Sequence, residues 1–205
     1  MEIFSYVIPS DFGFAPNPFH GVCTLATCKP QIRKSASVGD WVIGTGTKVC
    51  GIDGMLVFAM EISQKITFNE YWLDPAFQCK KPNINGSLKQ TYGDNIYHLD
   101  EVSGMWMQAD SHHSYADGTT NYHNLNRDTS SDSVLISKHF FYFGNSVQDI
   151  PDDLRSKVIK KGPAHKRIRR AEDVTLFIEW LKNSFEPGYY DKPRQFDSFK
   201  RYSGM

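Results

Sequence analysis

The first third of the chain contains the residues Gly39-Asp40-Trp41-Val42-Ile43-Gly44-Thr45-Gly46 and, after a short turn, Met55-Leu56-Val57-Phe58-Ala59-Met60-Glu61-Ile62. The second run is almost continuously apolar and has the length of a strand, which predicts a strand buried on both faces. Gly39-Asp40 is a turn pair that opens the first run, and Gly44 and Gly46 predict a bend or a close approach of the backbone. We therefore expect a strand over residues 40–46 and a buried central strand over residues 55–62.

Further elements are expected on either side of this pair. Alternating or β-branched and aromatic residues predict strands at residues 2–8, 96–99, 105–108, 133–137 and 139–144. Helices are expected at residues 68–73 behind a Thr67 cap, from Pro151 onward, and at residues 171–184. Short strands without βαβ alternation indicate the α+β class, as a strongly bent mixed sheet or a small β-barrel with flanking helices.

Composition limits the class of protein. The 205 residues hold 23 basic and 23 acidic side chains, so the chain is not basic overall, and 40% hydrophobic residues disfavour disorder. The longest apolar runs are too short for a transmembrane helix, so we expect no membrane insertion. Four cysteines do not match the dense disulfide framework of a small secreted domain, which favours the reducing cytoplasm. We expect a domain over residues 1–150, with residues 151–205 forming a basic segment and an amphipathic helix packed on it.

The zero net charge is a cancellation. Residues 155–170 hold eight Lys or Arg and no acidic residue, so the rest of the chain carries the balancing negative charge. Such a run attracts polyanions, although a solvated helix face is the plainer interpretation. The residues expected to contact a nucleic-acid backbone are Lys160, Lys161, Lys166, Arg167, Arg169 and Arg170.

Two cysteines lie close together at Cys23 and Cys28, and two basic residues, Lys29 and Arg33, follow. Positive charge and a histidine base would activate a thiol, so Cys28 or Cys23 is a candidate nucleophile. The alternative is a pair of packed, unreactive cysteines, since free Cys is among the most buried residue types. A zinc site is disfavoured because Cys50 and Cys79 do not form a second close pair.

A polar stretch from residue 110 to residue 132 is the second candidate site. His112 and His113, with carboxylates nearby, are candidates for acid–base work or for binding a divalent metal. Adjacent residues point to opposite faces of a strand, and the spacing matches no defined ligand motif, so we assign no metal site. A solvated loop is the alternative.

Several of these segments together resemble a known family. Gly13-Phe14-Ala15-Pro16-Asn17-Pro18-Phe19, the run from Cys23 to Pro30, the run from Gly39 to Gly46, Gly93-Asp94-Asn95-Ile96-Tyr97 and Asp128-Thr129 resemble the bacterial and phage family called nucleotide modification associated domain 2, over residues 1–150. The resemblance implies a link to systems that modify nucleic-acid bases and names no reaction. The central strands also look like the barrel entry of PUA-like domains, including the EVE and ASCH types, which hold a modified or flipped base beside a barrel.

We therefore expect recognition of a base, and a modified one in particular, from a nucleic acid or a nucleotide. Aromatic side chains would stack on the base, amides and a carboxylate would read its edge, and two cations would meet phosphate. The expected ligand residues are Phe14, Phe19, Trp41 and Trp106 for stacking, Asn17, Asn95 and Asp128 for the edge, and Lys29 and Arg33 for phosphate. The alternatives are an enzyme acting on a base or nucleotide through Cys28 or Cys23 with His112 or His113, and a protein-interaction subunit of a modification or defence system. No cofactor or oligomeric state follows from the sequence.

Overall fold

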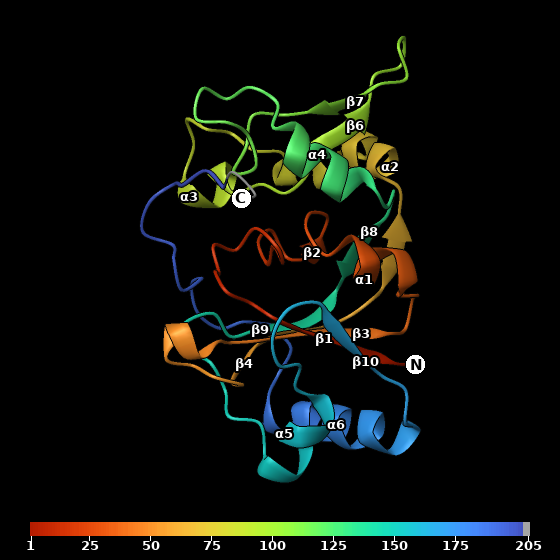
Figure 1. Ribbon diagram of the computed structural model, residues 1–205, viewed down its shortest axis with the longest axis vertical. Coiled ribbons are helices and arrows are strands. Elements are labelled where there is room, and N and C mark those ends of the chain that lie inside the picture. The colour runs from red at the N-terminus through yellow and green to blue at the C-terminus, as the bar shows by residue number, and fades with distance from the viewer. Residues whose placement is uncertain (203–205) are drawn as a thin grey trace. The chain divides into compact units, whose positions relative to one another are not determined.

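A computed structural model describes residues 1–202 (Figure 1). The chain divides into two units, each assembled from three separate segments. Unit 1 contains Met1–Asp11, Ala36–Ser63 and Ser137–Arg194, and unit 2 contains Phe12–Ser35, Gln64–Ile136 and the residues from Gln195. Residues from 151 to 194 thus belong to the same unit as the first strand of the chain. Each unit is described by itself.

A six-stranded mixed sheet forms the body of unit 1. Its order is β10 (His165–Ile168), β1 (Ile3–Val7), β3 (Trp41–Thr45), β4 (Leu56–Glu61), β9 (His139–Tyr142) and β11 (Gly188–Tyr189). The β1–β3 and β9–β11 pairs are parallel and the others antiparallel. The α+β class and the mixed sheet are confirmed. Among the described residues β10 and β11 lie at opposite edges of this sheet, so a closed barrel is not confirmed.

The strands predicted at residues 40–46 and 55–62 are β3 and β4, which lie in the middle of this sheet. The β3–β4 register shifts between Gly44 and Thr45, which is the irregularity that the glycine predicted. A Cβ on Gly44 would stand 2.3 Å from the Phe58 ring, so the backbone needs a residue without a side chain there.

Helices complete the core of unit 1. They are α5 (Asp152–Val158) and α6 (Ala171–Ser184), and a short 3₁₀ turn, η1 (Lys48–Cys50), follows β3. The face of α6 that the sequence periodicity predicted is buried, with Val174, Phe177, Ile178 and Leu181 in one apolar cluster with the sheet residue Trp41. This predicted helix is confirmed.

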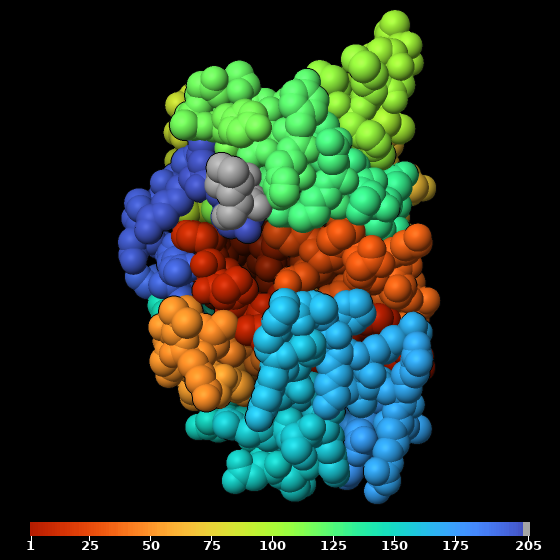
Figure 2. Space-filling model, viewed as in Figure 1, coloured from red at the N-terminus to blue at the C-terminus, as the bar shows by residue number. Residues whose placement is uncertain are grey.

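Unit 2 consists of short elements joined by long loops. Its strands are β2 (Cys23–Leu25), β5 (Gln64–Ile66), β6 (Tyr97–Leu99), β7 (Trp106–Gln108) and β8 (Val134–Ser137); its helices are α1 (Pro30–Ser35), α2 (Phe68–Leu73), η2 (Pro75–Lys80), α3 (Leu88–Thr91) and α4 (Tyr122–Thr129). The strands form a sheet of order β2-β8-β5 and a β6–β7 hairpin, whose connecting loop projects from the surface (Figure 2).

Local sequence explains helix α2 but not helix α4. Thr67 and Glu70 form the reciprocal cap that starts α2, as predicted from Thr67. By contrast, α4 lies inside the stretch expected to be a polar loop. It begins at Asn121, whose side chain accepts from the amides of His123 and Asn124, and it buries a single aliphatic residue, Leu125. With so little apolar periodicity the helix gives almost no hydrophobic signal in the sequence.

Aromatic packing dominates the core of unit 2, where Phe14, Phe68, Tyr71, Tyr92 and Tyr97 are buried together.

Of the helices that the structure describes, none combines the length and the apolar character needed to cross a bilayer.

Candidate active site

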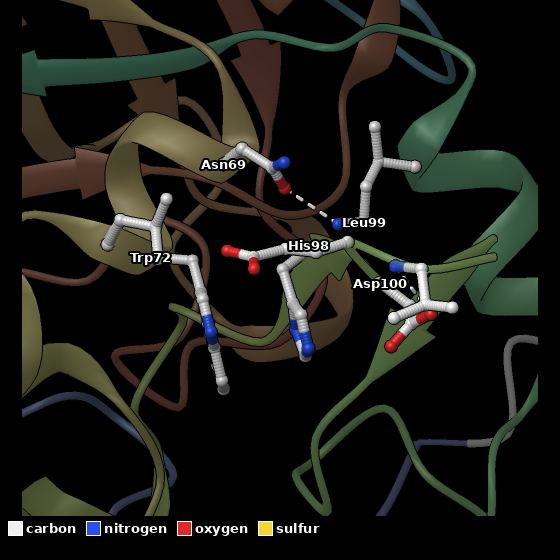
Figure 3. A pocket seen from close by; sticks show the side chains of 8 residues that line it. Asn69, Trp72, His98, Leu99 and Asp100 are labelled. Atoms are coloured by element: carbon white, nitrogen blue, oxygen red, sulfur yellow. Dashed lines mark hydrogen bonds between the residues drawn. The ribbon is translucent and has the colours of Figure 1, made fainter. Parts of the chain in front are cut away.

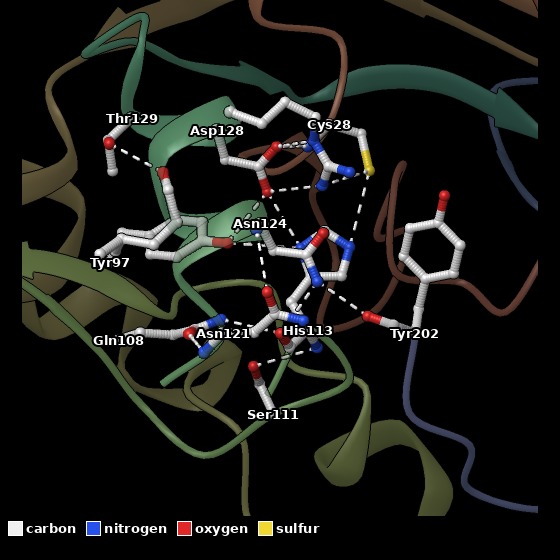
Figure 4. Close-up of polar contacts among 12 residues, drawn as sticks. Cys28, Tyr97, Gln108, Ser111, His113, Asn121, Asn124, Asp128, Thr129 and Tyr202 are labelled. Carbon is white, nitrogen blue, oxygen red and sulfur yellow. Dashed lines mark hydrogen bonds and ion pairs between the residues drawn. The ribbon is translucent and has the colours of Figure 1, made fainter. Parts of the chain in front are cut away.

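The site begins at Cys28, in the short connection between β2 and α1. Figure 4 shows its side chain among the polar contacts of the site. Cys28 and Lys29 have φ angles of +56° and +42°. Two consecutive non-glycine residues in the left-handed region are uncommon, and such strain is concentrated at functional sites. The Cys28 side chain is partly exposed, and all four cysteines of the chain are free. The backbone thus presents a reduced thiol from a strained turn.

His113 faces this thiol from the loop between β7 and α4. Its Nε2 lies 3.7 Å from Cys28 Sγ, and its Nδ1 lies 3.0 Å from Asp128 Oδ2. The imidazole is 1% exposed, and the edge contact of Phe14, at 4.7 Å between ring centroids, helps to fix its orientation. One histidine therefore connects a thiol to a buried carboxylate, as the dashed lines in Figure 4 show.

Asp128 lies in the last turn of α4 and is fully buried. Besides His113, it accepts hydrogen bonds from the Cys28 amide at 3.0 Å, the Tyr97 hydroxyl at 3.0 Å and Arg127 Nε at 2.9 Å. Burial alone would raise the pKa of Asp128, but the bonds and charges of His113 and Arg127 outweigh it and hold that pKa well below its usual range. Asp128 is thus an anion that orients the site.

The contact that lowers the pKa of Asp128 raises the pKa of His113. Burial would lower its pKa, but the adjacent Cys28 and Asp128 favour the protonated ring and raise the pKa of His113 to about 9. Tyr97 is buried beside the carboxylate, and burial with that negative charge raises its pKa well above 10. At neutral pH the site therefore holds a charged imidazole and a protonated phenol.

Two arginines complete the surroundings. Arg127 Nη2 lies 3.9 Å from Cys28 Sγ, on the side of the thiol that also faces Asp128. Arg33 is fully buried and donates to four backbone carbonyls, those of Cys28, Asp128, Ser131 and Ser133, at 2.5–2.9 Å. Arg33 therefore ties the Cys28 turn to the end of α4, and its donors are directed at the protein itself.

The C-terminal segment lies against His112 and His113. The Tyr202 ring centroid is 5.7 Å from that of His113, the Tyr202 amide donates to the His112 carbonyl, and Asn124 Nδ2 donates to the Tyr202 carbonyl at 2.8 Å. His112 Nδ1 lies 2.5 Å from the Lys200 carbonyl oxygen, which makes this nitrogen the donor. Burial, with the charge of His113, lowers the pKa of His112 to about 3, so this ring is neutral.

Of the residues proposed from sequence, Cys28, His113, Asp128, Lys29 and Phe14 gather at this site. Cys23 is buried in β2, and His112 packs beside the site rather than on the thiol. Tyr97, Arg127 and Tyr202 complete the site and were not among the site residues proposed from the sequence. Arg127 adjoins Asp128 in the sequence, and this adjacency is the one local signal that pointed to it.

The amides proposed to read a base are bound inside unit 2. Asn17 Oδ1 accepts from Lys80 Nζ at 2.8 Å, its Nδ2 donates to the Tyr92 carbonyl, and Asn95 Nδ2 donates to the Tyr71 carbonyl. The proposed stacking residues are placed apart: Phe19 is buried, Trp106 packs against Phe68 and is half-buried, and Trp41 is fully buried in the core of unit 1.

The residues proposed to bind a nucleic-acid backbone lie in unit 1. Most of them are exposed, and acidic neighbours compensate part of their charge. Glu2 pairs with Arg167 and with Arg169, and Glu172 pairs with Arg170. Lys160 Nζ donates to the Lys161 carbonyl, and Lys166 Nζ donates to the Lys157 carbonyl.

A separate pocket of about 330 Å³ opens beside α2 and the β6–β7 hairpin (Figure 3). Trp72 and His98 stack in it at 4.0 Å between ring centroids, and Lys81 Nζ lies 3.6 Å from the Trp72 ring. The pocket lining contains no cysteine. Across the described residues, no three His, Cys, Asp or Glu side chains are grouped so as to hold a metal ion.

Comparison with known proteins places the chain in a family. The family model for nucleotide modification associated domain 2 matches residues 1–200, nearly the whole chain. No curated protein and no solved structure matches the chain. The match extends beyond the segments that carried the resemblance and includes every residue of the thiol site up to Lys200. This chain belongs to the nucleotide modification associated domain 2 family.

Proposed function

We propose that this protein is a cysteine-dependent enzyme that transfers or hydrolyses an acyl group in the modification of a base or nucleotide. One observation carries the proposal: His113 joins the Cys28 thiol to the buried Asp128 carboxylate through its two ring nitrogens. A nucleophile, a histidine and an orienting carboxylate in this sequence of contacts are the parts that acyl transfer requires, because the histidine moves a proton twice in each cycle.

The proposed reaction begins with attack of the Cys28 thiolate on the carbonyl carbon of the substrate. The new S–C bond forms as the carbonyl electron pair moves to oxygen. Collapse of this intermediate breaks the bond to the leaving amine or alcohol, which takes the proton from His113 Nε2. Water or a second nucleophile then gives its proton to His113 and attacks the thioester carbonyl. The S–C bond breaks, the acyl group leaves on the new nucleophile, and the Cys28 thiolate and protonated His113 are restored.

In this scheme Asp128 and the residues around Cys28 and His113 each have a role. Asp128 holds His113 by Nδ1, so that Nε2 stays directed at sulfur. Tyr97 donates to the same carboxylate oxygen, at 3.0 Å, and limits the positions that the carboxylate can adopt. Arg127 Nη2, close to Sγ, is placed to stabilise negative charge that develops on the carbonyl oxygen.

The sequence led us to expect that the protein recognises a base. In this proposal the recognised group is the substrate, which binds at the thiol site. A base or a nucleotide is the expected substrate because the family is associated with nucleotide modification. The basic run of unit 1 keeps its proposed part as a contact for nucleic-acid backbone. The reaction requires a reduced thiol, which the cytoplasmic location expected from the sequence would maintain.

Thiol chemistry tests the proposal directly. The full-length protein is treated with iodoacetamide at pH 7, and alkylation of each cysteine is followed by peptide mass spectrometry. We expect Cys28 to react faster than the exposed Cys79. His113→Ala should slow the alkylation of Cys28 by about 100-fold, the scale of general acid–base assistance, and leave the rate at Cys79 unchanged.

The acyl step has its own readout. p-Nitrophenyl acetate should give a burst of nitrophenol and one acetyl group on Cys28, removable by hydroxylamine as a thioester. Cys28→Ala should abolish the burst, whereas Cys79→Ala should keep it. A Cys28 that alkylates no faster than Cys79 and takes up no acetyl group would refute the proposed function.

A further inference from the structure

We infer that the substrate of this site carries an anionic oxygen group, a phosphate or a carboxylate, and that Arg127 binds it beside Cys28. The inference deepens the proposed function and rests on it, because it takes Cys28 as the reacting centre. It adds a chemical class of substrate and a residue that selects it.

The geometry of Arg127 points to a ligand. Its Nε and Nη2 are directed at Asp128, at 2.9 Å and 3.2 Å, and Nη2 also contacts Cys28 Sγ at 3.9 Å. The side chain is 28% exposed, although the carboxylate that it binds is fully buried. The described residues form no hydrogen bond with Nη1. The guanidinium is therefore fixed on one edge and open on the other, next to the nucleophile.

The charges around the thiol favour an anion at that open edge. His113, Arg127 and Arg33 surround one carboxylate, Asp128, and one thiol, Cys28. Arg33 directs its donors to carbonyl oxygens, so in the described contacts no carboxylate binds it directly. Even with Cys28 ionised, the three positive charges of His113, Arg127 and Arg33 exceed the two negative charges of Asp128 and Cys28. Partly buried positive charge in excess draws an anion to the site.

Lys29 adds to the same field. It follows Cys28 in the strained turn, and its ammonium group interacts with both Cys28 and Arg127. A planar guanidinium with a free edge matches the paired oxygens of phosphate or carboxylate, which a single ammonium group cannot match as closely. Arg127 is thus the better candidate for selecting an oxyanion, and Lys29 for attracting it.

Protection of Cys28 from alkylation tests the inference on the wild-type chain. The rate with iodoacetamide is measured at constant ionic strength with inorganic phosphate, acetate, uridine monophosphate or uridine. We expect phosphate and uridine monophosphate, or acetate if the group is a carboxylate, to slow Cys28 at least fivefold and saturably. Uridine, which carries no anion, should give less protection than its monophosphate. Chloride at the same ionic strength serves as the reference.

Two variants assign the effect to the guanidinium. In Arg127→Gln the protected and unprotected rates are compared within the variant, and the anion concentration for half-protection should rise at least tenfold. Arg127→Lys, which keeps the charge and loses the fork, should fall between Arg127→Gln and the wild type. Lys34→Gln removes a positive charge from an exposed position on α1 and should protect as the wild type does.

The failures are distinguishable. If Cys28 is unreactive in the absence of any anion, the proposed function is lost. If Cys28 is reactive but no anion protects it, or Arg127→Gln is protected at the wild-type concentration, the function stands and the inference is refuted. If Arg127→Gln does not fold, the comparison of Arg127→Lys with the wild type still decides whether the guanidinium binds the anion.

Discussion

His113 Nδ1 and Asp128 Oδ2 lie 3.0 Å apart, and neither side chain is more than 1% exposed. An ion pair this deep in a protein is maintained only when further hydrogen bonds satisfy the remaining groups. Here Tyr97 and the Cys28 amide supply two of them. The pair therefore couples the protonation of His113 to the position of the thiol.

Asp128→Asn should remove the coupling between the protonation of His113 and the position of the Cys28 thiol. The amide keeps the shape of the carboxylate and removes its charge, so the protonated form of His113 loses the stabilisation that Asp128 adds to that of Cys28, and the alkylation of Cys28 should slow by at least 10-fold at pH 7. Peptide mass spectrometry gives the rate. Asp117→Asn, at an exposed position whose carboxylate binds only nearby groups of its own loop, is the matched control. Equal rates in the wild type and Asp128→Asn would contradict the coupling.

The raised pKa of His113 predicts the alkaline behaviour. The folded protein holds this proton up to about pH 9, whereas an unfolded chain releases it near pH 6.5. The stabilisation is thus complete below pH 6.5 and is lost as the pH rises to 9. We expect the urea midpoint to fall over this interval, and His113→Gln, which cannot take up the proton, to flatten the fall. A wild-type midpoint that stays constant from pH 6.5 to 9 would contradict it.

His112 acts in the opposite sense. Its folded pKa of about 3 lies below the ordinary value of 6.5, so the unfolded chain takes up a proton first as the pH falls. Stability should decline from pH 6.5 toward pH 3. His112→Asn should decline less steeply, and His123→Asn, at an exposed position in α4, should follow the wild type. Urea unfolding at half-unit pH steps provides the comparison; parallel curves for wild type and His112→Asn would refute this assignment.

Arg33 should be a structural arginine. Its removal leaves the carbonyls of Cys28, Asp128, Ser131 and Ser133 without their donors in the interior, and a buried acceptor left without its donor costs about 1–3 kcal/mol. Arg33→Ala should lower the free energy of unfolding by that amount. Lys34→Ala, one residue further along α1, should change it by less than about 0.5 kcal/mol. Urea denaturation decides, and a loss as small as that of the lysine variant would exclude the structural role.

Arg201 should hold the C-terminal segment against the site. It pairs with Asp110, and one of its nitrogens donates to the Ser111 carbonyl at 2.9 Å. Arg201→Ala should increase amide hydrogen exchange at Tyr202, whose amide is bonded to the His112 carbonyl. Lys200→Ala, whose side chain is exposed, is the control. Unchanged exchange at Tyr202 in Arg201→Ala would show that the other contacts suffice.

The sequence by itself determined the elements whose signals lie within a few residues. The cap of α2 needs only Thr67 and Glu70, and α6 repeats its apolar residues at the helical period, so both were predicted with their bounds. The two central strands were predicted from an apolar run and its glycines. Helix α4 was missed because its interior contacts are polar, through Asn124 and Asp128.

Only the tertiary structure decided which candidates form the site. Cys28, His113 and Asp128 were each proposed for separate reasons, but 85 residues separate the thiol from its histidine and 100 separate it from the carboxylate. Three other candidates are buried and bind protein groups in place of a ligand. Arg33 donates to backbone carbonyls, and the side chains of Asn17 and Asn95 are hydrogen-bonded in the interior. A sequence states which groups are present. Which of them share a dry interior depends on contacts between distant residues, and these exist only once the chain has folded.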